Sequence, residues 1–237
     1  MHLAILMTNI DESDFSAQWP KDGAKFAGLV ALVRPAWRFT VFSVKDGEFP
    51  EDIGAFDGAI ITGSPASVTD DMPWVAQLMG VIREAVAKAV PLFGACFGHQ
   101  AIAQALGGQV GSSPQGWALG LWQTEVVARA EWMTRAPDRL SLYAAHVEQV
   151  VALPPGAEVL TRSPDCPVGG FRIGRAVFTT QYHPEMTPDF VAALVTHLEG
   201  EVPKTVTERA RAGLAGKPDQ VEMAREIAAF FEVARGA

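Results

Sequence analysis

The sequence of 237 residues is poor in cysteine and in clustered positive charge. Its two cysteines, Cys96 and Cys166, allow at most one disulfide, and a reducing compartment would prevent even that one. Lysine and arginine total 19 against 27 aspartates and glutamates, which gives a formal charge of −8 at pH 7. Because no basic cluster of five or more residues occurs, we expect neither nucleic acid nor an anionic membrane as a partner.

Long hydrophobic segments are missing as well. The apolar start of the chain meets Asn9, Asp11 and Glu12 too early for a signal peptide or a spanning helix, so we expect a cytoplasmic protein. No metal-ligand motif and no glycine-rich phosphate loop is present, so we expect no metal and no cofactor. Hydrophobic residues make up 49% of the chain and charged residues 19%, values typical of a globular protein with one substantial core.

Apolar runs alternate with helical periodicity in the first half of the chain. Strands are predicted over residues 3–8, 38–44, 57–62 and 90–95, and helices around 26–33 and over 73–89 and 97–106. Strands that alternate with helices form right-handed crossovers and a parallel sheet, with ligands at the carboxyl ends of the strands. The polar run 9–22 is then expected as a loop at that edge.

From residue 109 onward the pattern changes to short β-like runs separated by glycine and proline. These runs are residues 121–127, 140–144, 149–153, 157–161, 170–173 and 176–182. They predict antiparallel strands added to the parallel core. The expected fold class is therefore α/β, with a mostly parallel central sheet flanked by helices in a flavodoxin-like three-layer arrangement.

The C-terminal part of the chain is predicted to be helical. Residues 187–198 form a helix with Thr187 as its cap, and residues 205–236 are rich in alanine, arginine and glutamate. The apolar stripe in this last segment is Val221, Ala224, Ala228 and Phe231, widened by Ile227 and Phe230. The stripe fits either a helix packed on the domain or a face for a dimer or partner. We expect a domain over residues 1–202 and a helical extension over 203–237 packed on it.

The segment 90–100 joins a predicted strand to a predicted helix through Cys96. Gly94 and Gly98 stand two places either side of this cysteine, as in a nucleophile elbow, where small neighbours allow a sharp turn. The helix N-terminus favours an anion. A cysteine thiol in water is only a few per cent ionised at pH 7, and a helix terminus contributes only about 0.3–2 kcal/mol, so a histidine should complete the site.

His183 is the strongest candidate among the five histidines. It ends the apolar run 176–182 and is followed by Pro184 and Glu185. Residues two apart in an extended chain point to the same side, so the Glu185 carboxylate could orient the His183 imidazole. Cysteine, histidine and carboxylate are then all available for nucleophilic catalysis.

Three segments together resemble the class I glutamine amidotransferase family, the cysteine-dependent glutaminase domain. They are residues 60–65 (Ile-Ile-Thr-Gly-Ser-Pro), 94–100 (Gly-Ala-Cys-Phe-Gly-His-Gln) and 181–185 (Gln-Tyr-His-Pro-Glu), in the order that the family has them. Residues 66–74 are similar to stand-alone members related to the glutaminase domain of GMP synthetase and to plant γ-glutamyl peptidases. The resemblance spans most of the first 200 residues.

This resemblance implies a Cys-His-Glu triad, with Cys96 as nucleophile, His183 as base and then acid, and Glu185 as its orienting group. It implies hydrolysis of the glutamine γ-amide through a γ-glutamyl thioester, with a separate synthetase subunit or a homodimer as expected partner. The alternative for the same triad is a γ-glutamyl peptidase that cleaves γ-glutamyl peptides such as glutathione derivatives.

The resemblance also implies the groups around the triad. The backbone N–H groups of Ser64 and Phe97 would form the oxyanion hole, and Gly63 would allow the turn beside the substrate. Gln100 and Gly120 would lie against the glutamate part of the substrate.

Two readings of other classes remain open. A cysteine hydrolase related to α/β-hydrolases would take its acid from before the histidine, with Asp138 or Asp165 as candidates, although Glu185 argues against it. A non-catalytic binding or regulatory module would keep the fold while Cys96 stayed unreactive.

The other four histidines have weaker signals. His146 begins the segment His-Val-Glu-Gln-Val, which resembles the family's His-Gly-Asp-x-Val, and we interpret it as a structural or supporting residue. His99 is predicted to pack within the helix that follows Cys96. His2 and His197 have no supporting constellation.

Overall fold

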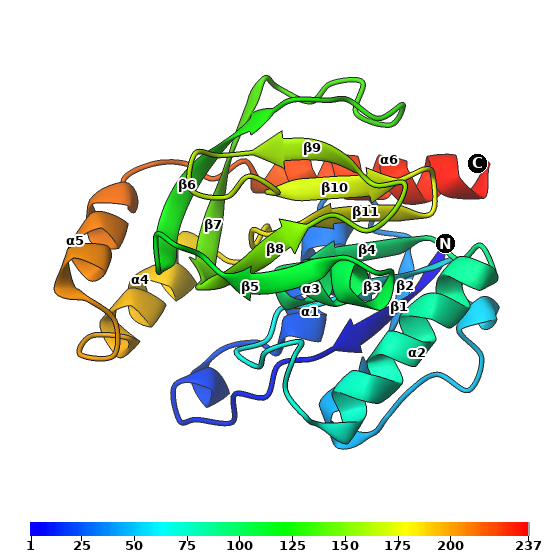
Figure 1. Cartoon of the computed structure of the whole chain (residues 1–237), viewed down its shortest axis with the longest axis horizontal. Coiled ribbons are helices and arrows are strands. Elements are labelled where there is room, and N and C mark those ends of the chain that lie inside the picture. The colour runs from blue at the N-terminus through cyan, green and yellow to red at the C-terminus, as the bar shows by residue number, and fades with distance from the viewer. Residues whose placement is uncertain (237) are drawn as a thin grey trace.

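The computed structural model describes residues 1–236 and has a nine-stranded sheet between two layers of helices (Figure 1). The strand order is β2-β1-β3-β4-β11-β10-β9-β6-β7. The five parallel strands are β2 (Arg38–Ser43), β1 (His2–Met7), β3 (Gly58–Ile61), β4 (Leu92–Ala95) and β11 (Val177–Thr180). The antiparallel ones are β10 (Gly170–Ile173), β9 (Glu158–Arg162), β6 (Ala118–Val126) and β7 (Arg139–His146). The predicted α/β fold with added antiparallel strands is confirmed.

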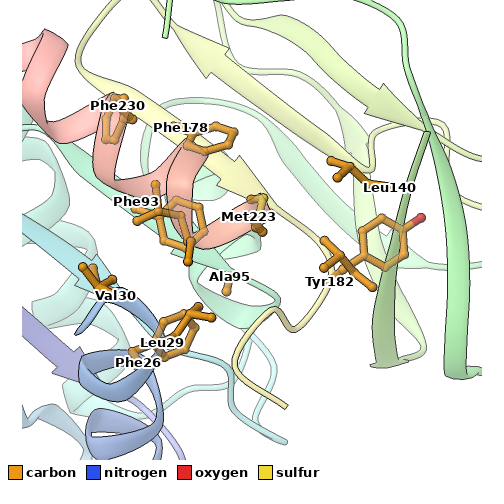
Figure 2. Packing of buried hydrophobic residues seen from close by; sticks show 14 of the residues in the cluster. Phe26, Leu29, Val30, Phe93, Ala95, Leu140, Phe178, Tyr182, Met223 and Phe230 are labelled. Carbon is orange, nitrogen blue, oxygen red and sulfur yellow. The ribbon is translucent and has the colours of Figure 1, made fainter. Parts of the chain in front are cut away.

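The four parallel strands β1, β3, β4 and β11 are buried because helices cover each side of the sheet, whereas the edge strand β2 is partly exposed. On one face, α1 (Asp22–Ala31) and α6 (Gln220–Arg235) pack on Leu3, Ile5 and Phe93, the cluster drawn in Figure 2. On the other face, α2 (Pro73–Ala87) and α3 (Phe97–Ala105) pack on Ala4 and Leu6. Successive residues of a strand point to opposite faces, so β1 contributes to both cores.

A second, two-stranded sheet was not fully anticipated. Its strands are β5 (Gln109–Ser112) and β8 (Glu148–Ala152), which pair antiparallel. The sequence pattern predicts no strand over residues 109–112, where only Val110 is apolar and both end residues are exposed. The backbone pairing with β8 therefore makes residues 109–112 a strand, although their own sequence pattern does not predict one.

The C-terminal segment forms two helices instead of one stretch. They are α5 (Lys204–Gly213) and α6, separated by residues 214–219, and α4 (Pro188–His197) precedes them. The predicted stripe on α6 is buried in the core, which favours packing on the domain over a partner face; only Val221, at 44% exposure, stands outside it. The division at residue 202 stays a prediction, and Ala237 lies outside the described residues.

None of the helices in the described part of the chain combines the length and the apolar character that crossing a membrane requires.

Candidate active site

Cys96 occupies a strained turn between β4 and α3. Its φ of 50° and ψ of −107° lie in a region that a residue with a side chain rarely adopts. Such conformations cost about 1–3 kcal/mol and persist where the surrounding structure fixes them. Two backbone hydrogen bonds do so here: Cys96 N–H donates to the Thr180 carbonyl (2.9 Å) and Gly98 N–H donates to the Thr62 carbonyl (3.1 Å).

The two glycines of the elbow are required by close contacts. A Cβ at Gly94 would lie 2.6 Å from the carbonyl carbon of Gly98, and a Cβ at Gly98 would lie 2.3 Å from the carbonyl oxygen of Ile61. Both partners are backbone atoms, which cannot rotate away as a side chain can. The spacing of Gly94 and Gly98 around Cys96 therefore corresponds to a turn that lies so close to β3 and β4 that no side chain fits at either glycine.

His183 and Glu185 follow β11 and form a buried pair. His183 Nδ1 lies 2.7 Å from Glu185 Oε1, and His183 N–H donates to the Tyr143 carbonyl of β7 at 2.8 Å. Burial alone lowers the pKa of His183, but the nearby Cys96 and Glu185 outweigh it and raise this pKa well above 6.5. The imidazole thus carries a proton more readily than a free histidine does, with Nδ1–H directed to the carboxylate.

The loop after β3 brings Gly63 and Ser64 to the same place. A Cβ at Gly63 would lie 2.7 Å from His183 Cε1 and 3.6 Å from Cys96 Cβ, so this glycine borders both side chains. Among residues 1–236, the backbone N–H groups of Ser64 and Phe97 donate to no partner. Two unpaired donors at the ends of neighbouring strands are what an oxyanion hole needs.

Gln100 and His146 converge on one backbone carbonyl beside the elbow. Gln100 Nε2 donates to the Glu148 carbonyl (2.7 Å) and to Gln181 Oε1 (3.2 Å), and His146 Nδ1 lies 3.0 Å from the same Glu148 oxygen. Burial, together with the nearby His183, lowers the pKa of His146 to about 4. His146 is therefore neutral at pH 7, in keeping with a supporting position rather than that of a charged partner.

The other three histidines contact other groups than the triad. His99 is fully buried with Nδ1 2.8 Å from Thr179 Oγ1, and burial lowers its pKa to about 3, which confirms the predicted packed residue. His2 contacts Thr40, and His197 stacks on Phe15 at a centroid distance of 4.4 Å.

The second cysteine differs from Cys96 in its environment. Both cysteines are free, so the one disulfide that two cysteines would allow does not form. Burial raises the pKa of the Cys166 thiol to about 12, which keeps it protonated and unreactive at pH 7. Only Cys96 combines a helix N-terminus with an adjacent histidine.

Gly120 packs against a helix. The resemblance placed it against the substrate, but the structure places it in β6 against α5, where a Cβ would lie 2.7 Å from Ala210 Cα. Its φ of 90° is a second reason for glycine at this position. This close contact accounts for a glycine here, and a substrate contact of Gly120 stays a prediction.

The acid of the hydrolase alternative is also placed elsewhere. The Asp138 side chain is 94% exposed and pairs with Arg129 at 2.7 Å. Asp165 borders a second, small cavity. His183 Nδ1 is already bound by Glu185. The arrangement contradicts that alternative.

A cavity of about 700 Å³ opens at Cys96 and His183. Its lining residues come from the carboxyl ends of β1, β3 and β4, from the loop of residues 9–21 and from α4. The lining contains Cys96, His183, Glu185, Gly63, Ser64, Gln100, His146 and Glu148. Aromatic side chains that the sequence analysis did not assign to the site also line it, including Phe15, Trp19, Trp117 and Phe190. Within residues 1–236, no group of three or more metal-ligating side chains is arranged to hold an ion.

Comparison with known proteins assigns the family. The model of class I glutamine amidotransferases matches residues 31–191, which include the elbow and the segment 181–185, so the chain belongs to that family. Similar relatives include γ-glutamyl peptidase 3 of Arabidopsis thaliana, 31% identical over 67% of both chains. The glutamine-hydrolyzing GMP synthase of Aeropyrum pernix is 32% identical over 54% of this chain and 24% of its own length. Membership supports hydrolysis of an amide bond.

Solved structures agree on the fold. A glutamine amidotransferase from Thermotoga maritima has a TM-score of 0.76 at 18% identity and covers 100% of this chain and 98% of its own. A glutamine amidotransferase from Methylobacillus flagellatus has a TM-score of 0.75 at 23% identity and covers 98% of this chain and 92% of its own. At such identities the likeness concerns the fold alone.

Proposed function

We propose that the chain hydrolyses the γ-amide of glutamine through a γ-glutamyl thioester on Cys96. The observation that carries the proposal is the Glu185–His183 hydrogen bond of 2.7 Å beside Cys96 at a strained elbow. A nucleophile, a base and a group that orients the base are the three parts of a catalytic triad. The name of the matched family supports the same reaction.

The reaction divides into two steps. The Cys96 thiolate adds to the γ-carbonyl carbon, and the oxyanion accepts hydrogen bonds from Ser64 N–H and Phe97 N–H. His183 gives its Nε2 proton to the departing nitrogen, the C–N bond breaks and the thioester remains. A water molecule, deprotonated by His183, then attacks the thioester and releases glutamate and the thiol.

The oxyanion hole is proposed to supply a large share of the barrier reduction. One such donor is typically worth about 2.7–4 kcal/mol in the transition state. Gly63 keeps the approach to these donors open because a side chain there would meet His183. Gln100, fixed by its bond to the Glu148 carbonyl, is proposed to contact the glutamate part of the substrate.

The size of the cavity favours a second candidate, hydrolysis of γ-glutamyl peptides. Its volume of about 700 Å³ lies in the range of about 300–1,000 Å³ that drug-sized ligands occupy, well above what ammonia as a leaving group needs. Several curated relatives of similar length are named γ-glutamyl peptidases. If glutamine is the substrate, the ammonia acceptor would be a separate synthetase subunit, and a homodimer is the other assembly we propose.

Covalent labelling tests both the nucleophile and the substrate class. A chloroketone analogue of glutamine is expected to add once per chain, at Cys96, and peptide mass spectrometry locates the adduct. Cys166 serves as an internal control because its buried thiol stays protonated. Glutamine and a γ-glutamyl dipeptide, used as competing protectors, distinguish the two candidates. No adduct at Cys96 at neutral pH would contradict the proposal and favour a binding module.

Replacing Glu185 by glutamine is expected to lower kcat/KM by roughly 10²-fold or more, because the amide no longer stabilises the His183 imidazolium. Glu185 raises the pKa of His183, so its removal lowers that pKa and moves the alkaline limb of the pH–rate profile to lower pH. The profile is measured beside Glu84→Gln, a change on the exposed side of α2. An unshifted alkaline limb in Glu185→Gln would remove Glu185 from the mechanism.

A further inference from the structure

One side of the cavity is a continuous apolar wall. We use this name for six residues: Phe15, Trp19, Met186, Phe190, Leu194 and Leu198. They come from the loop of residues 9–21 and from the chain between β11 and the end of α4. The Trp19 ring meets the Phe190 ring edge-on at 5.2 Å, and Phe15 stacks on His197, so the loop and α4 are fixed against each other.

The apolar wall continues from the part of the chain that carries His183. In the proposed reaction His183 protonates the departing nitrogen, so the amine leaves past this imidazole. Met186 follows His183 by three residues and donates its N–H to the His183 carbonyl at 3.4 Å. Phe190 and Leu194 continue the same face one and two turns into α4. The segment that follows His183 and Glu185 therefore gives the cavity an apolar lining.

The γ-glutamyl part of a substrate does not fit this wall. Its α-ammonium and α-carboxylate need polar partners, because a buried charge without one is costly. Such partners are offered by other residues of the lining, among them the loop of residues 63–67, Gln100 and Glu148. The wall is left for the amine that the reaction releases.

The charged residues of the cavity lining also restrict the charge that the released amine can carry. The carboxylates are Asp11, Glu12, Asp22, Glu148, Glu185 and Glu201, against the lysines Lys21 and Lys25. Lys25 is held by Asp22 at 2.9 Å and lies over the Phe190 ring at 3.9 Å. A leaving group with a further negative charge is thus not favoured, whereas an uncharged apolar group is.

We propose that the substrates are γ-glutamyl amides of bulky apolar or aromatic amines, whose amine part packs on the apolar wall. This inference rests on the second candidate of the proposed function, hydrolysis of γ-glutamyl compounds larger than glutamine, because it concerns the leaving group of that same thioester chemistry. The released amine takes its proton from His183, and water supplies the oxygen of the glutamate product. The acidic lining favours a simple aromatic amine without a carboxylate as the leaving group, and an aromatic amino acid is the other outcome that the test distinguishes.

The test compares kcat/KM for four substrates: glutamine, γ-glutamylglycine, γ-glutamylphenylalanine and γ-glutamyl phenethylamide. At least one aromatic amide is expected to exceed γ-glutamylglycine and glutamine by roughly 10-fold or more, as burial of an aromatic group allows. The better of the two aromatic amides then identifies the leaving group as an amino acid or a simple amine.

Variants of the wall give a second, independent readout. Phe15→Ala and Trp19→Ala are expected to lower the ratio of the aromatic rate to the glycine rate by roughly 5-fold or more, because each removes part of the contact. A ratio within one preparation is insensitive to the fraction of folded protein. Leu32→Ala is the matched control: it is 63% exposed just beyond α1, outside the cavity lining, and should leave the ratio unchanged.

The outcomes separate this inference from the proposed function. Equal rates for the aromatic amides and γ-glutamylglycine, or unchanged ratios in both wall variants, would overturn the inference while amide hydrolysis stands. No turnover of any substrate, together with no adduct at Cys96, would overturn the proposed function and the inference with it.

Discussion

Cys96→Ser is expected to lose amide hydrolysis by about 10⁴-fold or more while the protein keeps its fold. The hydroxyl that replaces the thiol is far harder to ionise, and the buried His183–Glu185 pair is arranged beside a thiol. Catalytic groups that act as a unit fail together, so the remaining two members cannot compensate. Steady-state release of ammonia or amine measures the loss.

Stability separates this effect from misfolding. Serine has nearly the volume of cysteine and would keep the positive φ of residue 96, so the backbone strain is the same in both proteins. The melting temperature should therefore stay within a few degrees of the parent. Cys166→Ser, at the other buried cysteine, should retain turnover. Residual activity of a tenth in Cys96→Ser, or a large fall in melting temperature, would contradict the assignment.

Some parts of the site could be predicted because their signals are local. His183 and Glu185 are two residues apart in an extended segment, so their side chains point to the same side and the carboxylate lies close to the imidazole. The elbow was readable because Gly94 and Gly98 flank Cys96 at a spacing that a sharp strand-to-helix turn requires. The roles of these residues in catalysis remain a proposal.

Other parts could not be read because they depend on distant contacts. Phe15 and Trp19 lie in a polar loop whose sequence gives no sign that α4 will complete an apolar wall with Phe190. For Gly120 the resemblance implies a contact with the substrate, and nothing in the sequence shows that Ala210, ninety residues later, packs on this glycine. Tertiary packing decides both.

Gly98→Ala is expected to destabilise the protein by about 3 kcal/mol or more and to reduce turnover of what remains folded. The added methyl would lie 2.3 Å from the Ile61 carbonyl oxygen and 2.8 Å from its carbonyl carbon, so β3 and α3 must move apart. Such a shift would stretch the hydrogen bond from Gly98 N–H to the Thr62 carbonyl, now 3.1 Å. Urea unfolding of the two proteins measures the difference.

The matched control is Gly80→Ala, at a glycine inside α2. A Cβ there has no atom within 4 Å, and the residue is helical, so alanine should be neutral or stabilise the fold by about 0.5–1 kcal/mol. The same chemical change thus has opposite signs at the two sites, because only Gly98 faces the backbone of β3. If both variants unfolded at the parent's urea midpoint, the close crossing of α3 over β3 would not constrain the elbow. A loss confined to Gly98→Ala, with turnover falling alongside stability, would tie the position of the Phe97 N–H and the Cys96 thiol to that crossing.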